Sequence, residues 1–240
     1  MDIKLNYIEK GAGFPFLFLH GNGENLCYFQ HQIDYFSKSY RVIAIDTRGH
    51  GGSPRGTSSF TIPQFAEDLL CFMEEHQLTK AHILGFSDGG NIALTFALKY
   101  PEHVEKLILN GANLSPSGLK KYVQIPIILE YHLASIFCEK SALAKKKAEL
   151  LSLMAKEPNI QRSQLLQLRI PTLVIAGTKD MIREKHTKLI FECLPNAQLA
   201  IIPGDHFLAN RHPSAFNGRV AAFLCGELIQ KEDPDSFSAL

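Results

Sequence analysis

Short apolar runs alternate with longer amphipathic stretches along most of this chain of 240 residues. The apolar runs have the length of buried β-strands, whereas the longer stretches repeat apolar residues every three or four positions, as helices do. The expected strands span residues 3–8, 16–19, 41–46, 81–84, 106–109, 171–177 and 198–202. This alternation is typical of an α/β fold with a mostly parallel sheet of seven or eight strands, flanked by helices.

The alternation stops between Asn113 and about Leu165, where no strand pattern occurs and the residues indicate two or three helices. The first part of this insert, residues 123–131, is strongly apolar. Residues 118–162 carry eight basic and four acidic side chains, which leaves a preference for an anionic substrate open. We expect the insert to line a site at the strand ends that it joins, although a plain packing layer is the alternative.

The segment Gly85-Phe86-Ser87-Asp88-Gly89 joins an expected strand to an expected helix. A serine with glycine two residues before and two residues after, in that context, is the pattern of a nucleophile elbow. The turn demands unfavourable backbone angles at the serine, and a Cβ at either glycine would collide with a neighbouring element. The pattern therefore predicts an exposed Ser87 hydroxyl at the positive end of a helix. A glycine-rich turn without chemistry is the alternative interpretation.

A second loop with candidate chemistry, His20-Gly21-Asn22-Gly23, follows the strand at 16–19. Such a loop supplies one backbone N–H of an oxyanion hole, and the residue after the nucleophile, here Asp88, supplies the other. We expect the amide of Asn22 to be the first donor, with Gly23 as the alternative. His20 is open to interpretation as a second base, but a structural ring bonded to nearby backbone is favoured.

Polar turns also follow three other strands. Asp46, Arg48 and His50 come after the strand at 41–46, and we interpret them as a rigid turn whose side chains bond buried backbone groups. Asp180 and His206 follow the last two strands. Serine, acid and histidine thus occur in the chain order of the α/β-hydrolase triad, each at the carboxyl end of a strand.

On these motifs the chain resembles the α/β-hydrolase superfamily over nearly its whole length, in the compact group of esterases, lactonases and carbon–carbon hydrolases. The resemblance implies Ser87 as nucleophile, His206 as general base and then acid, and Asp180 as the group that orients His206. It implies neither a metal nor a cofactor. Asp205, next to His206, is the alternative acid, although a neighbour at that position usually points away.

The resemblance also implies two structural units. Residues 1–113 and 166–240 would form the core, and residues 114–165 a small helical cap inserted after the sixth strand. Ile127 and Ile128 of the cap would contact the substrate together with Gly21 and Gly23. Only one clear strand precedes Gly11, so the hairpin that often begins this fold is in question.

Composition indicates which classes of partner and which cellular compartment to expect. The net charge is +1, with 25 basic and 24 acidic residues, so neither nucleic acid nor an acidic membrane is indicated as a partner. Five scattered cysteines without metal-binding spacing indicate reduced thiols, and hence a cytoplasmic protein. No apolar stretch is long enough to span a bilayer. A small-molecule substrate is the expected partner, and the oligomeric state stays open.

The sequence therefore predicts a serine hydrolase that cleaves a small ester, lactone or related carbonyl compound through an acyl-enzyme. Within the same fold, haloperoxidase-like and aminopeptidase members share the serine triad and remain alternatives. Dehalogenases and epoxide hydrolases resemble this chain less, since they imply an aspartate at the position of Ser87. Outside catalysis, a small-molecule receptor or signalling regulator that retains the triad is a further alternative.

Overall fold

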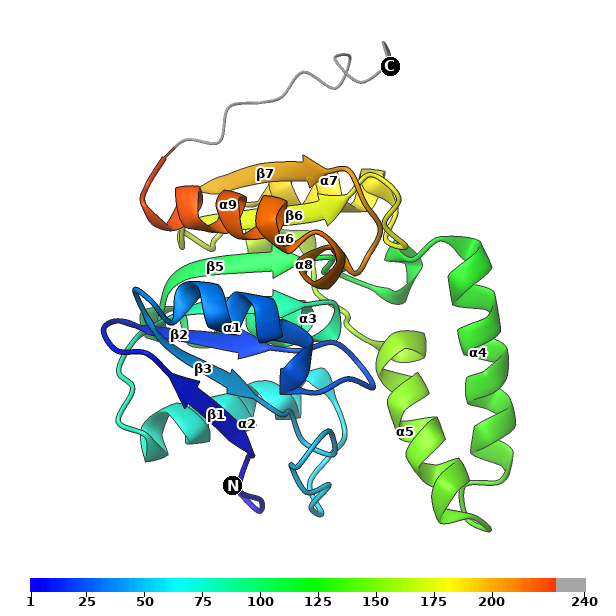
Figure 1. Ribbon diagram of the computed structural model, residues 1–240. Coiled ribbons are helices and arrows are strands. Elements are labelled where there is room, and N and C mark those ends of the chain that lie inside the picture. Colours follow the sequence, from blue (N-terminus) through cyan, green and yellow to red (C-terminus); the bar gives the residue numbers. More distant parts are fainter. Residues whose placement is uncertain (228–240) are drawn as a thin grey trace.

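The computed structural model describes residues 1–227, and within that range seven strands form one twisted sheet (Figure 1). The strands are β1 (Tyr7–Lys10), β2 (Pro15–Leu19), β3 (Arg41–Ile45), β4 (Ala81–Phe86), β5 (Val104–Asn110), β6 (Thr172–Gly177) and β7 (Ala197–Ile202). Their order across the sheet is β1-β3-β2-β4-β5-β6-β7, and only β1 runs antiparallel to its neighbour. The mostly parallel sheet is confirmed. Residues 228–240 of the predicted core lie outside the described residues.

The first strand is displaced from its expected position at residues 3–8. It begins at Tyr7, because the polar groups before it bond to a turn rather than to a strand. Asn6 donates its backbone N–H to the Ser53 hydroxyl at 2.8 Å, and Asp2 accepts from the Arg48 guanidinium at 2.6 Å. Sequence alternation alone does not distinguish these two kinds of partner.

Helices cover both faces of the sheet (Figure 1). They are α1 (Gln30–Phe36), α2 (Ile62–Glu75), α3 (Asp88–Lys99), α4 (Lys121–Ile136), α5 (Ala142–Lys156), α6 (Arg162–Leu165), α7 (Glu184–Cys193), α8 (Leu208–Arg211) and α9 (Pro213–Leu224), with short 3-10 turns at Leu26–Phe29, Pro101–His103 and Pro116–Gly118. One core cluster joins one sheet face to α2, α3 and α7, and the other joins the opposite face to α1, α8 and α9. On β2, Leu17 and Leu19 enter the first cluster while Phe16 and Phe18 enter the second. Both faces of the strand are thus buried, which explains its continuous apolar run.

The insert consists of α4, α5 and α6, and its first two helices lie beyond the carboxyl ends of the strands (Figure 1). It follows the fifth strand of the described chain, β5, and not the sixth as expected, because a single strand precedes β2. Lys120 donates its backbone N–H to the Met181 carbonyl at 2.9 Å, which fixes the start of α4. On α5, Glu149 pairs with Arg55 of the core at 2.8 Å. Both helices of the hairpin of α4 and α5 are therefore tied to the core.

Candidate active site

The elbow at Ser87 lies between β4, which ends at Phe86, and α3, which begins at Asp88. Ser87 has φ 53° and ψ −120°, a conformation that side-chain-bearing residues rarely adopt. A Cβ on Gly85 would overlap the carbonyl oxygen of Gly89, and a Cβ on Gly89 would overlap the carbonyl oxygen of Leu19. Both glycines are therefore required by close packing around a strained serine, as the sequence predicts.

Ser87, His206 and Asp180 lie in hydrogen-bonding contact, although they are far apart in the chain. His206 Nε2 is 3.0 Å from Ser87 Oγ, and His206 Nδ1 is 2.7 Å from Asp180 Oδ1. Asp180 Oδ1 also accepts the backbone N–H of Ile182 at 2.8 Å. Since a carboxylate only accepts, Nδ1 carries the proton and donates, which leaves Nε2 free to accept from the serine hydroxyl.

Asp205 does not compete for the imidazole. Its Oδ1 accepts the backbone N–H of Phe207 at 3.0 Å, and its Oδ2 pairs with the Arg211 guanidinium. A different neighbour shapes the space behind His206: Gly111 has φ +62°, and a Cβ there would lie 2.7 Å from His206 Cε1. No sequence pattern marks Gly111, because the need for a residue without a Cβ arises only where β5 and the His206 loop meet.

The loop at residues 20–23 borders the serine. A Cβ on Gly21 would lie 3.3 Å from Ser87 Cβ, so this glycine allows the loop to approach the nucleophile closely. Asp88 is the first residue of α3, and its N–H therefore has no acceptor within the helix. The side chain of Asn22 donates to the Leu150 carbonyl of α5 at 2.7 Å. Gly23 is exposed, with φ +75° and open space around its Cα.

His20 is a structural residue. Its Nε2 accepts the Thr47 backbone N–H at 3.0 Å, so the proton is on Nδ1, which donates to the Gly21 carbonyl at 2.7 Å. Burial lowers the pKa of His20 to about 4, and the ring is neutral at pH 7. The favoured interpretation from the sequence is confirmed, and the ring fixes the loop that carries Gly21.

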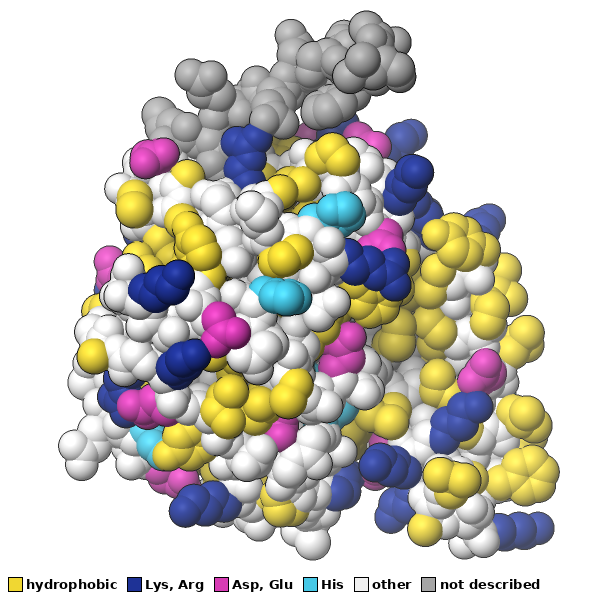
Figure 2. Space-filling model, in the orientation of Figure 1, with side chains coloured by type: hydrophobic (Ala, Val, Ile, Leu, Met, Phe, Trp, Pro, Cys, Tyr) yellow, Lys and Arg dark blue, Asp and Glu magenta, His cyan; other side chains and the backbone are white. Residues whose placement is uncertain are grey.

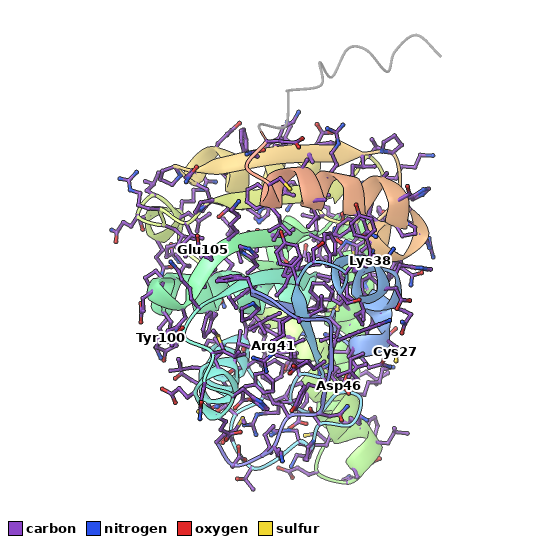
Figure 3. The ribbon with its side chains drawn as sticks, turned by 60° about the vertical axis from the view of Figure 1, so that its left-hand side comes forward. Cys27, Lys38, Arg41, Asp46, Tyr100 and Glu105 are labelled. Carbon is purple, nitrogen blue, oxygen red and sulfur yellow. The ribbon has the colours of Figure 1, made fainter. Side chains whose placement is uncertain are left out.

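The turn after β3 is structural as well. Figure 3 marks Arg41, the first residue of β3, and Asp46, which follows the last residue of the strand. Asp46 accepts backbone N–H groups from Leu26 at 2.7 Å and from Gly52 at 2.8 Å. Its carboxylate therefore serves buried backbone groups, as expected, and joins the turn to the segment that leads into α1.

Two carboxyl groups near the triad are marked by no sequence pattern. Glu24 is half-buried, and its Oε2 is enclosed without a hydrogen-bond partner among the described residues. Burial raises its pKa to about 7. Asp88 is buried, with Oδ1 accepting from Asn91 at 3.1 Å and Oδ2 unpartnered, and burial raises its pKa to about 6. The elbow motif points only to the amide of Asp88, and no motif marks Glu24.

Ile127 and Ile128 lie half-buried on α4. The hydrogen bond that joins the insert to the loop at Asn22 comes from α5 and not from α4. Contact of these two isoleucines with a substrate therefore stays a prediction.

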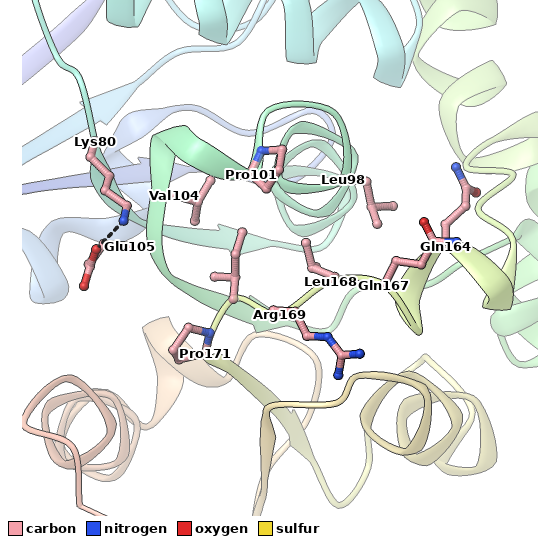
Figure 4. A pocket seen from close by; sticks show the side chains of 11 residues that line it. Lys80, Leu98, Pro101, Val104, Glu105, Gln164, Gln167, Leu168, Arg169 and Pro171 are labelled. Carbon is pink, nitrogen blue, oxygen red and sulfur yellow. Dashed lines mark ion pairs between the residues drawn. The ribbon is translucent and has the colours of Figure 1, made fainter.

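A cavity of about 680 Å³ lies at the other end of the sheet (Figure 4). Lys80, Val104 and Pro171, which line it, lie at the amino-terminal starts of β4, β5 and β6. The ion pair between Lys80 and Glu105, 2.7 Å long, lies in its wall. The triad loops follow the carboxyl ends of the strands, so this cavity is separate from them.

Residues 1–227 contain neither a metal-binding cluster nor a membrane-spanning helix. No group of three or more histidine, cysteine or acidic side chains in this range is arranged to hold a metal ion. No helix in the same range combines the length and the apolar content that a membrane span requires.

Known proteins resemble this chain over most of its length. The α/β hydrolase fold family matches residues 15–131. The 3-oxoadipate enol-lactonase 2 of Acinetobacter baylyi is 29% identical over 93% of this chain and 94% of its own. The human serine hydrolase BPHL is 27% identical over 92% and 83% of the two chains. A solved hydrolase from Pseudomonas aeruginosa PA01 is 25% identical over 92% of this chain and 94% of its own, with a TM-score of 0.77.

The solved Pseudomonas hydrolase shares the fold in which the Ser87 elbow lies, and the other two relatives are named as a lactonase and a serine hydrolase. The chain is thus an enzyme of the hydrolase class and belongs to the α/β-hydrolase superfamily.

Proposed function

We propose that this enzyme cleaves a small ester, lactone or related carbonyl compound, with Ser87 as nucleophile, His206 as base and acid, and Asp180 as the group that orients His206. One observation carries the proposal. His206 lies between the other two side chains, with Nδ1 2.7 Å from Asp180 and Nε2 3.0 Å from the hydroxyl of a strained serine. These distances are those required for proton transfer from a serine to an imidazole base.

The reaction has two halves. His206 Nε2 accepts the Ser87 proton as Oγ bonds to the substrate carbonyl carbon, and the carbonyl oxygen becomes an oxyanion. The N–H groups of Asp88 and Asn22 donate to that oxyanion, each contributing about 3 kcal/mol to the transition state. His206 then protonates the departing alcohol, which leaves an acyl-enzyme on Ser87. Water then gives a proton to His206 as its oxygen bonds to the acyl carbon, and the bond from that carbon to Ser87 Oγ breaks as His206 returns the proton to Oγ.

The carbonyl class rests on two considerations. The relative from Acinetobacter baylyi is named an enol-lactonase, which supports a lactone or ester for this chain. The mechanism needs no metal and no cofactor, since the triad and two backbone amides supply all the charge stabilisation that acyl transfer requires.

A substrate panel tests the proposal. Purified protein is assayed on p-nitrophenyl esters of increasing acyl length, on simple lactones and on a peptide amide. Ser87→Ala removes the nucleophile, whereas Ser163→Ala, at an exposed position on α6, is the matched control. We expect turnover of esters or lactones that Ser87→Ala reduces at least a thousandfold and that Ser163→Ala leaves intact. Turnover of the peptide amide alone would instead favour an aminopeptidase.

We also propose that the enzyme works in the cytoplasm on a freely diffusing small molecule. All five cysteines are free thiols in the structure, including the exposed Cys27 and Cys225. Exposed thiols of this kind persist in a reducing compartment. Fractionation of the source cells, with detection of the protein by antibody, tests the location.

A further inference from the structure

Exposed apolar side chains gather on the hairpin of α4 and α5. Among the residues that the structure describes, twelve large apolar side chains are exposed, and seven of them lie between positions 122 and 143. They are Tyr122 (69%), Ile125 (54%), Leu129 (65%), Leu133 (60%), Ile136 (70%), Phe137 (48%) and Leu143 (79%). Figure 2 shows apolar side chains over the region where Figure 1 places α4.

Five of the seven form a stripe along α4, defined by Tyr122, Ile125, Leu129, Leu133 and Ile136. The steps between them are three, four, four and three residues, so all five lie on one side of the helix. The stripe contains no charged residue and runs for about 20 Å at 1.5 Å per residue. Ala134, which lies off the stripe, is buried.

Exposure of this kind is unusual for a monomeric protein. Single exposed apolar residues are ordinary, but contiguous patches beyond a few hundred square ångströms mark surfaces that bind something. With about 200 Å² for a whole side chain of this size, the seven residues present about 900 Å², of which the five on α4 that are spaced three or four residues apart present about 640 Å². Each partner contributes about 800 Å² to a stable protein interface, so the exposed apolar area is of the size that such an interface needs.

The spacing of the stripe indicates which partner fits it. Steps of three, four, four and three read the same in both directions, with Leu129 at the centre. A second copy related by a two-fold axis at Leu129 places its α4 antiparallel to the first. Tyr122 then faces the partner's Ile136, and Ile125 faces the partner's Leu133. Self-complementary contacts of this kind are those that two-fold symmetric dimers require.

The charges of α4 itself balance, so this helix does not favour an anionic lipid surface over a second copy. Helix α4 carries one lysine, Lys121, and one glutamate, Glu130. Glu130 already pairs with Lys147 of α5 at 2.9 Å. Antiparallel α4 helices would also bring the two α5 helices to the outside of a four-helix arrangement. We propose that two copies of this chain form a dimer through the α4 stripe, with Leu129 on the two-fold axis.

Sedimentation equilibrium of the full chain at 1 to 100 µM tests the dimer. The expected mass is twice the 26.8 kDa of one chain. Leu129→Glu places two carboxylates face to face on the axis and should weaken association at least 50-fold. Leu129 is 65% exposed, so the fold should survive, which far-UV circular dichroism checks. Leu166→Glu, at an exposed position just after α6 and outside the stripe, is the control that stays dimeric.

Cysteine cross-linking tests the position of the axis. Leu129→Cys should form a covalent dimer on mild oxidation, because position 129 of one copy faces position 129 of the other. Leu133→Cys should not, because its copies would be separated by about eight residues, or roughly 12 Å, along the helix pair. Both changes are made in a background with Cys27 and Cys225 replaced by serine, since these are the exposed native thiols.

Three results would overturn the proposal. A wild-type mass of one chain throughout the concentration range would exclude the dimer. A dimer that Leu129→Glu leaves unchanged would place the interface elsewhere. A monomer that binds vesicles of anionic phospholipid, and loses that binding in Leu129→Glu, would assign the stripe to a lipid surface.

Discussion

Replacement of Asp88 by asparagine should change how the stability of this protein depends on pH. Asp88 is 6% exposed, and burial raises its pKa from 3.8 to about 6. In the unfolded chain the carboxyl has its ordinary pKa, so between these two values the folded state binds more protons than the unfolded state. The folded state is therefore destabilised as pH rises through this window. Asparagine keeps the shape and the backbone amide but cannot ionise.

The size of the effect follows from the shift. A difference of roughly two pKa units corresponds to about 3 kcal/mol at 1.36 kcal/mol per unit. The free energy of unfolding of Asp88→Asn, relative to wild type, should rise by about that amount between pH 4 and pH 7.5. Typical domains are stable by about 5–15 kcal/mol, so the change is readily measured.

Urea unfolding followed by far-UV circular dichroism is a suitable assay, because the chain contains no tryptophan. Asp34→Asn is the control. Asp34 is exposed and pairs with Lys10, and its lowered pKa gives a pH dependence of the opposite sign. A difference between Asp88→Asn and wild type that stays within about 0.5 kcal/mol across the pH range would refute the argument from burial.

Three further outcomes follow from the site. Asp180→Asn should reduce kcat by several thousandfold in an ester assay with the fold intact, because the amide favours the wrong imidazole tautomer. Asp205→Asn should change kcat less than tenfold. The reverse order of the two effects would identify Asp205 as the acid. In the same urea assay, Glu24→Gln should remove a second loss of stability, which occurs as pH rises from 4.5 to about 7. This loss is smaller than that caused by Asp88, because Glu24 is partly exposed. An unchanged pH dependence of stability in Glu24→Gln would contradict the prediction. Alanine at both Ile127 and Ile128 should shift the acyl length with the highest kcat/KM, measured across acetyl to octanoyl esters, without loss of short-ester turnover. The reason is that each methylene buried against these side chains contributes about 0.8 kcal/mol. Parallel curves of kcat/KM against acyl length for the variant and wild type would exclude these residues from the pocket.

Local patterns predicted the parts of the fold that depend on nearby residues. The elbow at Ser87 was predictable because its glycines and its strand-to-helix context lie within one short segment. The positions of Asp180 and His206 were predictable because parallel strands end at one edge of a sheet. The apolar runs identified the strands β2 to β7 for the same local reason.

Features that depend on packing between distant segments were not predictable. The start of β1 was misplaced because its preceding polar groups bond to a turn more than 40 residues away. The environments of Glu24 and Asp88 arise where several loops meet, and no spacing in the chain encodes them. Burial along α4 was not predictable from its apolar run either: Ile125 and Leu129 are more than half exposed, because periodicity does not reveal which neighbour covers a helix face.

Covalent labelling of the folded enzyme with a fluorophosphonate probe tests the central claim most directly, because only an activated serine reacts at an appreciable rate. Peptide mapping by mass spectrometry then locates the modified residue. We predict a single adduct on Ser87, absent from Ser87→Ala and absent from wild-type protein unfolded in urea. An adduct on any other serine, or none on folded wild-type protein, would contradict the proposed role of Ser87 and with it the triad formed with His206 and Asp180.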